Sequence, residues 1–411
     1  MWRGPGDVLV TEHVDQQVRG FLAVLGHADA VHIPPRPHIS VAVLVTVAAV
    51  LSAATACSSD ANLRQRAGSP TVPQSRTTGL SASSATPTGP VTPTSSRPPG
   101  EFTIAFAGDV HFAERVGVRL AANPATVFAQ AAPGLRRPDL TMVNLETAIT
   151  NGGVQQNKAF TFRAPPSALT ALRDAGIDVV TMANNHGADF GVSGLRDSLA
   201  ASRAAQFPVI GIRANAAQAY APYRTTLGGS QIAIFAADQW QDETTLRLFS
   251  AGPSKPGIAN AREPQLVESV LAAKKAGYLV IVYLHWGTAY QACPNGDQTA
   301  LAAQLAEAGA AAVVGTHAHV LQGAGWRADG TYVAYGLGNY LWWRSFGTDQ
   351  DDNGVLTLTF RDGKVVADQF APSHVDVRGV PVPAAGERKQ RIAAQWAAKR
   401  DCTNLSATAP K

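Results

Sequence analysis

The chain has 411 residues, of which 45% are hydrophobic and 16% are charged. This composition allows a large buried core and excludes a wholly disordered protein. The formal net charge is +4, but the 34 lysines and arginines are spread along the chain and form no runs. The charge pattern therefore gives no indication of a nucleic-acid partner.

An uncharged apolar stretch at residues 39–56 is the first organised feature of the chain, and it ends in small residues before Cys57. Such a stretch is typical of an export signal, so we assign residues 1–56 to export. The sequence from Ala54 to Cys57 resembles a bacterial lipobox, in which the cysteine is lipidated. The stretch is also just long enough to cross a bilayer as an uncleaved signal anchor. Under both interpretations the protein is held at the extracytoplasmic face of the cell membrane, and we favour the lipid anchor at Cys57.

Residues 57–100 are rich in Ser, Thr, Pro, Ala and Gly and contain almost nothing apolar to bury. This composition predicts a flexible, partly extended tether. It would hold the following domain at some distance from the membrane.

From residue 101 onward, short apolar runs alternate with amphipathic segments, which predicts an α/β domain with buried sheets. The expected strands are 102–107, 140–145, 179–183, 209–212, 231–237, 278–284, 311–314 and 332–335. The expected helices are 167–175, 193–203, 264–275 and 298–308. Two later runs, 354–360 and 364–370, predict a hairpin. We place the domain at 101–375 and a C-terminal tail packed on it at 376–411, with a closing helix at 386–398.

Five histidines follow expected strands directly or lie in the loops that leave them. They are His111, His186, His285, His317 and His319. Ligands of open α/β sheets bind at the carboxyl ends of the strands, where these loops meet. Asp109, Glu146 and Asn185 occupy similar positions. A set of imidazoles, carboxylates and an amide suits Mn, Fe or Zn, and there are enough ligands for two divalent ions.

Each motif taken alone has an ordinary structural explanation. A Gly-Asp pair is usually only a turn, and a His-X-His pair is usually a surface loop. Asn185 could equally be a helix N-cap beside His186. The order of the motifs and their position at strand ends are what favour a metal site.

The ordered motifs resemble the CapA family of poly-γ-glutamate capsule synthesis proteins. They are Gly108-Asp109, Asn144-Leu145-Glu146, Asn184-Asn185-His186 with Asp189 and Gly191, His285-Trp286-Gly287, Gly315-Thr316-His317-Ala318-His319 and Leu337-Gly338-Asn339. The family is similar to calcineurin-like metallophosphoesterases, so the resemblance implies a four-layer α/β/β/α sandwich with two metals between strand ends.

The resemblance also implies a role for each residue. One metal would be held by Asp109, His111 and His319, and the other by Asn185, His285 and His317. Glu146 would take the position of the bridging carboxylate, where the wider superfamily has Gly-Asp-X-X-Asp in place of this chain's Val143 to Glu146. His186 would be the catalytic acid, with Asp109 as its catalytic partner among the ligands.

Two residues are candidate substrate-binding groups. Arg163 carries a guanidinium that matches phosphate or carboxylate, although a surface ion pair is an equal alternative. Asn339 lies in the last motif of the series.

The resemblance implies an accessory role in making, exporting or anchoring a polyglutamate or polyglutamine-type cell-wall or capsule polymer. The partners would be an anionic or amide-rich polymer, the membrane and polymer-synthase subunits. Two alternatives are a non-enzymatic component that binds polymer or synthase, and a secreted metallophosphodiesterase unrelated to polyglutamate.

The three cysteines of the chain predict one disulfide. If Cys57 is lipidated, Cys293 and Cys402 remain as a pair in a compartment that permits oxidation. Two separate free thiols are the alternative.

Overall fold

The computed structural model describes residues 97–240 and 243–411. The expected export segment, Cys57 and nearly all of the tether lie outside the described residues. The described residues belong to one compact unit that runs to Lys411. Within this part of the chain, no helix has the length and hydropathy needed to cross a membrane.

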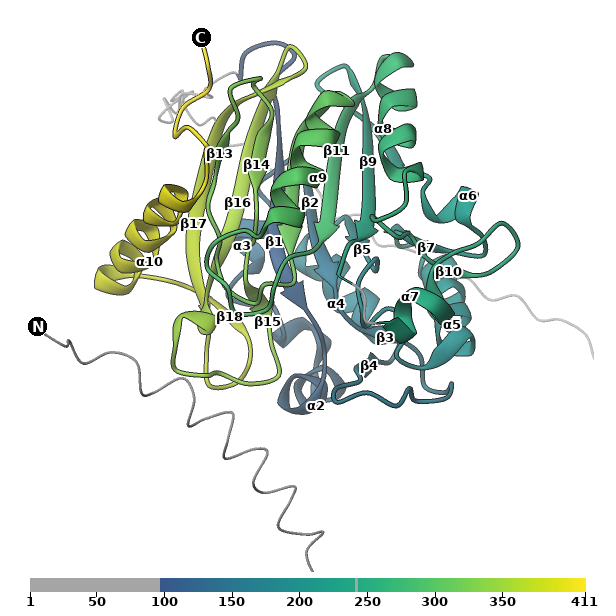
Figure 1. Ribbon diagram of the computed structural model, residues 1–411. Coiled ribbons are helices and arrows are strands. Elements are labelled where there is room, and N and C mark those ends of the chain that lie inside the picture. The colour runs from purple at the N-terminus through teal and green to yellow at the C-terminus, as the bar shows by residue number, and fades with distance from the viewer. Residues whose placement is uncertain (1–96, 241–242) are drawn as a thin grey trace, which may run out of the picture. The chain divides into compact units, whose positions relative to one another are not determined.

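The first large sheet has eight strands (Figure 1). It contains Asp109 of the first sequence motif and Asn339 of the last one. Its strands are β1 (Phe102–Val110), β2 (Leu140–Leu145), β5 (Val179–Thr181), β6 (Val209–Ile210), β15 (Asn339–Leu341), β16 (Asp352–Arg361), β17 (Lys364–Val375) and β18 (Pro381–Pro383). They are ordered β18-β17-β16-β1-β2-β5-β6, with β15 beside the end of β1. The strands from β1 to β6 run parallel, whereas β16, β17 and β18 form an antiparallel extension.

The second large sheet has six strands. They are β8 (Tyr223–Leu227), β9 (Ser230–Asp238), β11 (Leu279–His285), β12 (Ala310–Thr316), β13 (Ala324–Trp326) and β14 (Tyr332–Ala334). The order is β13-β14-β12-β11-β9-β8, with four parallel strands inside and an antiparallel strand at each edge. Two small sheets pair β3 (Ala148–Ile149) with β4 (Arg163–Ala164), and β7 (Ile212–Arg213) with β10 (Gly257–Ile258).

Helices flank both sheets. They are α2 (Glu114–Ala122), α3 (Ala132–Leu135), α4 (Ser167–Ala175), α5 (Gly191–Ala205), α6 (Ala216–Ala219), α7 (Glu243–Phe249), α8 (Gln265–Lys275), α9 (Gly296–Glu307) and α10 (Gly386–Ala398), with short 3₁₀ turns η1 (Pro124–Thr126), η2 (Asp349–Asp351) and η3 (Lys399–Cys402). Figure 1 shows α8 and α9 lying beside β9 and β11.

The two large sheets pack face to face. The rings of Phe106 on β1 and Tyr283 on β11 are 5.7 Å apart, and the Tyr283 hydroxyl donates to the Ala107 carbonyl. On the helical sides, α4 and α5 join the core of the first sheet, while α8 and α9 form a separate core with the second sheet. The predicted α/β class and the four-layer α/β/β/α sandwich are therefore confirmed.

The structure divides one expected strand. Residues 209–212 form two short strands, β6 in the first large sheet and β7 in a small sheet. Gly211 lies between them with a φ of +80°, and a Cβ at this position would come within 2.4 Å of the Ala183 side chain. The chain turns at Gly211 because only glycine tolerates both this dihedral angle and this contact.

The C-terminal residues pack on the antiparallel extension. The ring of Trp396 on α10 stacks on Phe370 of β17, with centroids 4.2 Å apart. Farther along, Cys402 is bonded to Cys293, with the two Cα atoms 5.7 Å apart. These contacts tie the last 25 residues or so to both large sheets.

Candidate metal centre

The site begins with a close approach between two glycines. The backbone N–H of Asp109 donates to the carbonyl oxygen of Gly338 at 2.9 Å. A Cβ on Gly108 would lie 1.9 Å from that oxygen, and Gly338 itself has a φ of +69°. Glycine at both positions lets the turn before β15 lie against β1. Asp109 and Asn339 thereby become neighbours in register.

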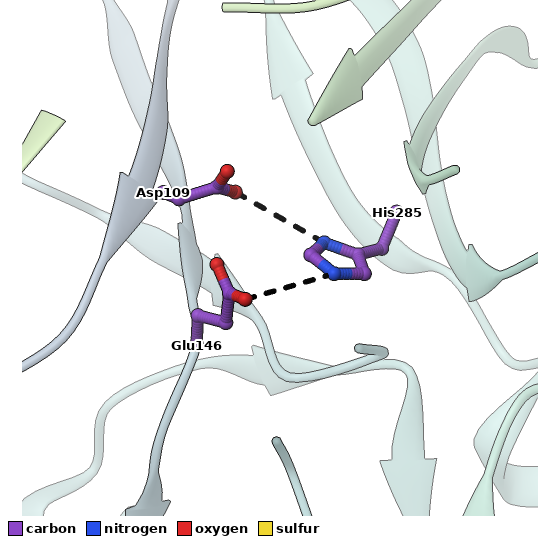
Figure 2. A group of neighbouring side chains, drawn as sticks. All are labelled: Asp109, Glu146 and His285. Carbon is purple, nitrogen blue, oxygen red and sulfur yellow. Dashed lines mark ion pairs between the residues drawn. The ribbon is translucent and has the colours of Figure 1, made fainter. Parts of the chain in front are cut away.

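Three buried side chains from different strands meet at the carboxyl ends of both sheets, as Figure 2 shows. Asp109 is the second-last residue of β1, Glu146 follows β2 directly, and His285 is the last residue of β11. His285 Nδ1 lies 4.0 Å from Asp109 Oδ1, and His285 Nε2 lies 3.8 Å from Glu146 Oε1. One ligand atom from each residue lies within 4.8 Å of the others, so the three could hold one metal ion.

The Glu146 carboxylate is buried without compensation from hydrogen bonds. Among the described residues, neither of its oxygens has a hydrogen-bond partner. Burial raises the pKa of Glu146 well above its ordinary value, and the nearby charge of Asp109 raises it further. An isolated buried carboxylate is costly, whereas a divalent cation reverses this penalty. The donor set of the site therefore fits a divalent metal ion.

Imidazoles complete the centre from the side of the second sheet. His317 Nδ1 lies 3.0 Å from His285 Nε2, and His317 Nε2 is another buried atom without a partner in the described part of the chain. Burial lowers the pKa of both residues well below the ordinary value. Both rings are therefore neutral at pH 7, which is the form that binds metals. His319 Nδ1 lies 3.3 Å from Asp109 Oδ2.

The loop after β12 holds two of these histidines in strained backbone conformations. His317 has a φ of +88° and His319 a φ of +55°. Residues other than glycine seldom adopt such angles, and when they do they cluster at functional sites. In this loop the His319 ring lies near Asp109 and Glu146, and the His317 ring lies against His285.

Two asparagines connect the carboxylates with the imidazoles. Asn144 Nδ2 donates to Asp109 Oδ1 at 2.8 Å and lies 3.1 Å from His285 Nδ1. Asn185 Oδ1 lies 2.8 Å from His285 Nε2. This arrangement favours a proton on Nε2 of His285, donated to Asn185, and a cation could take the place of that proton. The expected ligands Asn185, His285 and His317 are thus adjacent.

His186 also lies near Glu146 and is held by a chain of polar contacts. Its Nδ1 lies 2.6 Å from Asp189 Oδ2, and its Nε2 lies 3.8 Å from Glu146 Oε1. Lys158 Nζ contacts the other Asp189 oxygen at 2.6 Å and donates to the Asn185 carbonyl. Burial lowers the pKa of His186, and Asp189 opposes this shift. The imidazole thus directs Nε2 into the site.

His111 lies in the site wall but is engaged differently from the other histidines. Its ring stacks on Phe162 at 4.2 Å and meets the edge of Trp342 at 4.3 Å. Its two nitrogens lie 3.2 and 3.3 Å from the backbone N–H groups of Ala113 and Trp343. A ligand role for His111 would require one of these contacts to open.

The two expected substrate-binding residues are also engaged with the protein. The exposed Arg163 lies with its guanidinium carbon 4.9 Å from the centre of the Phe190 ring. Asn339 is buried, and its Oδ1 lies 2.9 Å from His319 Nδ1. Asn339 thus contacts the ring of His319 and fixes its orientation.

Several residues that the motifs did not assign contribute to the site. Lys158 lies in an irregular polar segment, and Trp342 lies between His111 and His319. Asp238 ends β9 in register with His285 and raises the pKa of Glu146 slightly further. Asp238 had a signal in the sequence because it follows an expected strand directly, and Trp342 could be interpreted there as the wall of a groove. Lys158 had no such signal.

The two sheets of this α/β sandwich thus bring together, at their strand ends, a cluster of buried carboxylates and imidazoles that could hold a metal ion. The family model described as bacterial capsule synthesis protein PGA_cap matches residues 103–342, and the chain belongs to this family.

Individual relatives agree with this assignment. The "PGA biosynthesis protein CapA" of Bacillus subtilis is 27% identical over 245 residues, covering 58% of this chain and 63% of that protein. The "Probable polyglutamine synthesis accessory protein" of Mycobacterium tuberculosis is 31% identical over 192 residues, covering 44% of this chain and 50% of the relative. The chain thus spans less than two thirds of the length of these relatives. A solved hypothetical protein from Thermus thermophilus is 19% identical, with a TM-score of 0.41, over 66% of this chain and 98% of its own.

Proposed function

We propose that the protein is an accessory factor in making, transporting or anchoring a polyglutamate or polyglutamine-type polymer, and that it hydrolyses a phosphoester with the help of two divalent metal ions. The family assignment and the names of the relatives support the polymer. The observation that carries the chemistry is the buried Glu146 carboxylate, which lacks hydrogen bonds and faces His285.

The side chains divide into two groups by the chemistry they could perform. Asp109, Glu146, His285, His317 and Asn185 would hold the metals, with His319 on the side of Asp109. When bound, divalent ions would supply Lewis-acid activation of water and of the phosphoester.

His186 is placed to move a proton. Asp189 and Lys158 fix the ring, so Nε2 points toward the space beside Glu146. A group there can donate a proton to the leaving oxygen when its ring is protonated. The buried walls formed by Phe162 and Trp342 exclude water from this side of the site.

Elemental analysis and a panel of phosphomonoesters and phosphodiesters test the proposal together. The purified protein should carry close to two divalent ions, and His317→Ala should lose at least one. Arg224→Gln, on β8 away from the centre, is the control and should keep both. A protein that stays metal-free after reconstitution with Mn, Fe or Zn would rule out the metal centre. Full metal occupancy without hydrolysis would favour the non-enzymatic polymer-binding alternative.

We further propose that the protein is anchored at the extracytoplasmic face of the cell membrane through lipid on Cys57. The support is the apolar stretch at 39–56 and the small residues before the cysteine. Metabolic labelling with a radioactive fatty acid should mark the wild type and not Cys57→Ser. An unlabelled wild type that keeps the residues before Cys57 would replace the lipid anchor with the signal anchor.

A further inference from the structure

The loop after β15 presents an arginine beside the metal centre. The guanidinium carbon of Arg344 lies 4.3 Å from the centre of the Trp343 ring and 4.4 Å from that of Phe346. The residue is exposed, and no carboxylate of the described residues forms an ion pair with it. Two aromatic rings thus hold the guanidinium in position, and no described carboxylate pairs with it.

The loop that carries Arg344 is held in one conformation. The Asp351 carboxylate accepts hydrogen bonds from the Ser345 hydroxyl at 2.6 Å and from the backbone N–H groups of Phe346 and Gly347, both at 2.7 Å. Because Asp351 is fully engaged in this way, it orders the loop and does not neutralise Arg344. A guanidinium that is already oriented loses little freedom when it binds a ligand.

The arginine lies close to the centre through its neighbours in the chain. The backbone N–H of Trp343 contacts His111 Nε2 at 3.3 Å, and the preceding Trp342 lies 4.8 Å from the ring of His319. On its outer side, Trp343 lies 6.3 Å from the exposed ring of Phe160.

Tyr290 lies beside His319 of the centre. It is 59% exposed, has a φ of +66°, and its ring lies 5.9 Å from that of His319. A strained, exposed aromatic residue in this position suggests contact with a ligand.

We propose that Arg344 binds an oxyanion of the substrate, a carboxylate or a phosphate, at the mouth of the metal centre, with Trp343 and Tyr290 as the walls of this subsite. This inference rests on the proposed function of the centre. A guanidinium offers two parallel N–H donors that match the two oxygens of a carboxylate or phosphate.

The subsite bears on which polymer the protein handles. A γ-linked glutamate chain offers a carboxylate on every residue, whereas a glutamine chain offers only neutral amides. Hydrogen bonds between charged groups are worth about twice those between neutral groups. Arg344 would therefore favour the anionic chain over the amide chain.

Binding measurements on the full-length, metal-loaded protein test the subsite with three probes. The probes are a short γ-linked glutamate oligomer, a glutamine-type oligomer of equal length in which each free carboxylate is replaced by a neutral amide, and inorganic phosphate. Titration calorimetry compares the wild type with Arg344→Gln and Arg344→Lys. Arg224→Gln is the matched control, because Arg224 is also an exposed arginine over an aromatic ring, that of Tyr278, at 5.5 Å.

We expect Arg344→Gln to lower the affinity for an anionic probe by roughly tenfold or more, which corresponds to the loss of a charge-assisted hydrogen bond. Arg344→Lys should recover part of this loss, and the glutamine oligomer should be unaffected. A lower affinity for the glutamate oligomer identifies a carboxylate site, and a lower affinity for phosphate alone identifies a phosphate site.

Two results would overturn the subsite. One is equal affinity of the wild type and Arg344→Gln for both anionic probes, and the other is a wild type that binds neither. Metal content and phosphoester hydrolysis are measured on the same samples. If the metals and hydrolysis are intact while Arg344→Gln has no effect on binding, the subsite fails and the proposed function of the centre stands.

Discussion

Glu146 is a buried carboxyl group that receives no hydrogen bond from the described residues. Since burial raises its folded-state pKa, the folded protein holds a proton that the unfolded chain releases above the ordinary value of 4.5. In the metal-free protein, any stability linked to this proton is present below pH 4.5 and is lost as the pH rises through the folded pKa.

Glu146→Gln should therefore stabilise the metal-free protein at pH 7 to 8 and have little effect near pH 4. The same variant should lose the stabilisation that added Mn or Zn gives the wild type. Urea unfolding of both proteins, with and without metal, measures the two effects. Glu307→Gln, an exposed residue of α9, is the control. A metal-free Glu146→Gln that is less stable than the wild type at pH 7 would contradict this account.

Asp189 fixes the ring of His186 without being placed among the ligands. Asp189→Asn should leave the metal content unchanged and lower kcat for phosphoester hydrolysis by about 10²-fold, because the imidazole loses its orienting carboxylate. Inductively coupled plasma analysis and steady-state kinetics on the same samples separate the two roles. Asp297→Asn, exposed on α9, should retain full activity. Loss of metal from Asp189→Asn would show that the residue supports the ligands instead.

At the residue scale, the sequence pointed to three residues that the structure brings together, but not to all of their surroundings. Asp109, Glu146 and His285 could be found because each ends or follows a strongly apolar run, and parallel strands present such residues at one edge. Lys158 could not be found in this way, because it lies in a polar segment without periodicity. The engagement of Arg163 with Phe190 depends on tertiary packing that no local pattern reveals.

At the scale of elements, the contact between Gly108 and Gly338 joins the first and last motifs of the series. Gly108→Ala would place a methyl group 1.9 Å from the Gly338 carbonyl oxygen, where backbone atoms surround it. We expect a loss of about 2 to 4 kcal/mol in the free energy of unfolding, together with weaker metal binding, because Asp109 would move with β1.

Gly134→Ala on α3 is the matched comparison, because no atom lies within 4 Å of the added methyl group and its φ is not positive. This variant should be neutral or slightly stabilising. Urea denaturation of both variants measures the difference. Equal stability of Gly108→Ala and the wild type would show that β1 and the turn before β15 can separate at no cost.

The elements themselves were largely predictable, because the apolar runs of buried parallel strands are long and uninterrupted. Their boundaries were less so. Residues 209–212 read as one apolar strand, yet the contact of Gly211 with Ala183 sends the chain into a second sheet. Short pieces such as β3, β4 and β15 carry too few residues for a pattern, and they form because longer elements already lie beside them.

At the scale of the whole molecule, one covalent bond joins the loop after β11 to the C-terminal tail. Cys293 and Cys402 are separated by 109 residues in the sequence. The bond closes a loop that contains α9, β12 and the antiparallel extension. Removing such a bond allows the unfolded chain to expand. On the chain-entropy model, a loop of this length contributes about 4.7 kcal/mol, less any strain in the folded state.

We expect the double variant Cys293→Ser with Cys402→Ser to lose about 2 to 5 kcal/mol in the free energy of unfolding. Reduction of the wild type should give nearly the same value, because both treatments remove the same constraint. The α10 helix should exchange its amide protons faster in the variant, since the stack of Trp396 on Phe370 would then hold the helix without help from the tail beyond it. Non-reducing peptide mapping of the purified wild-type protein provides the direct check. Free thiols at both cysteines in the folded protein, or equal stability with and without reductant, would contradict the bond.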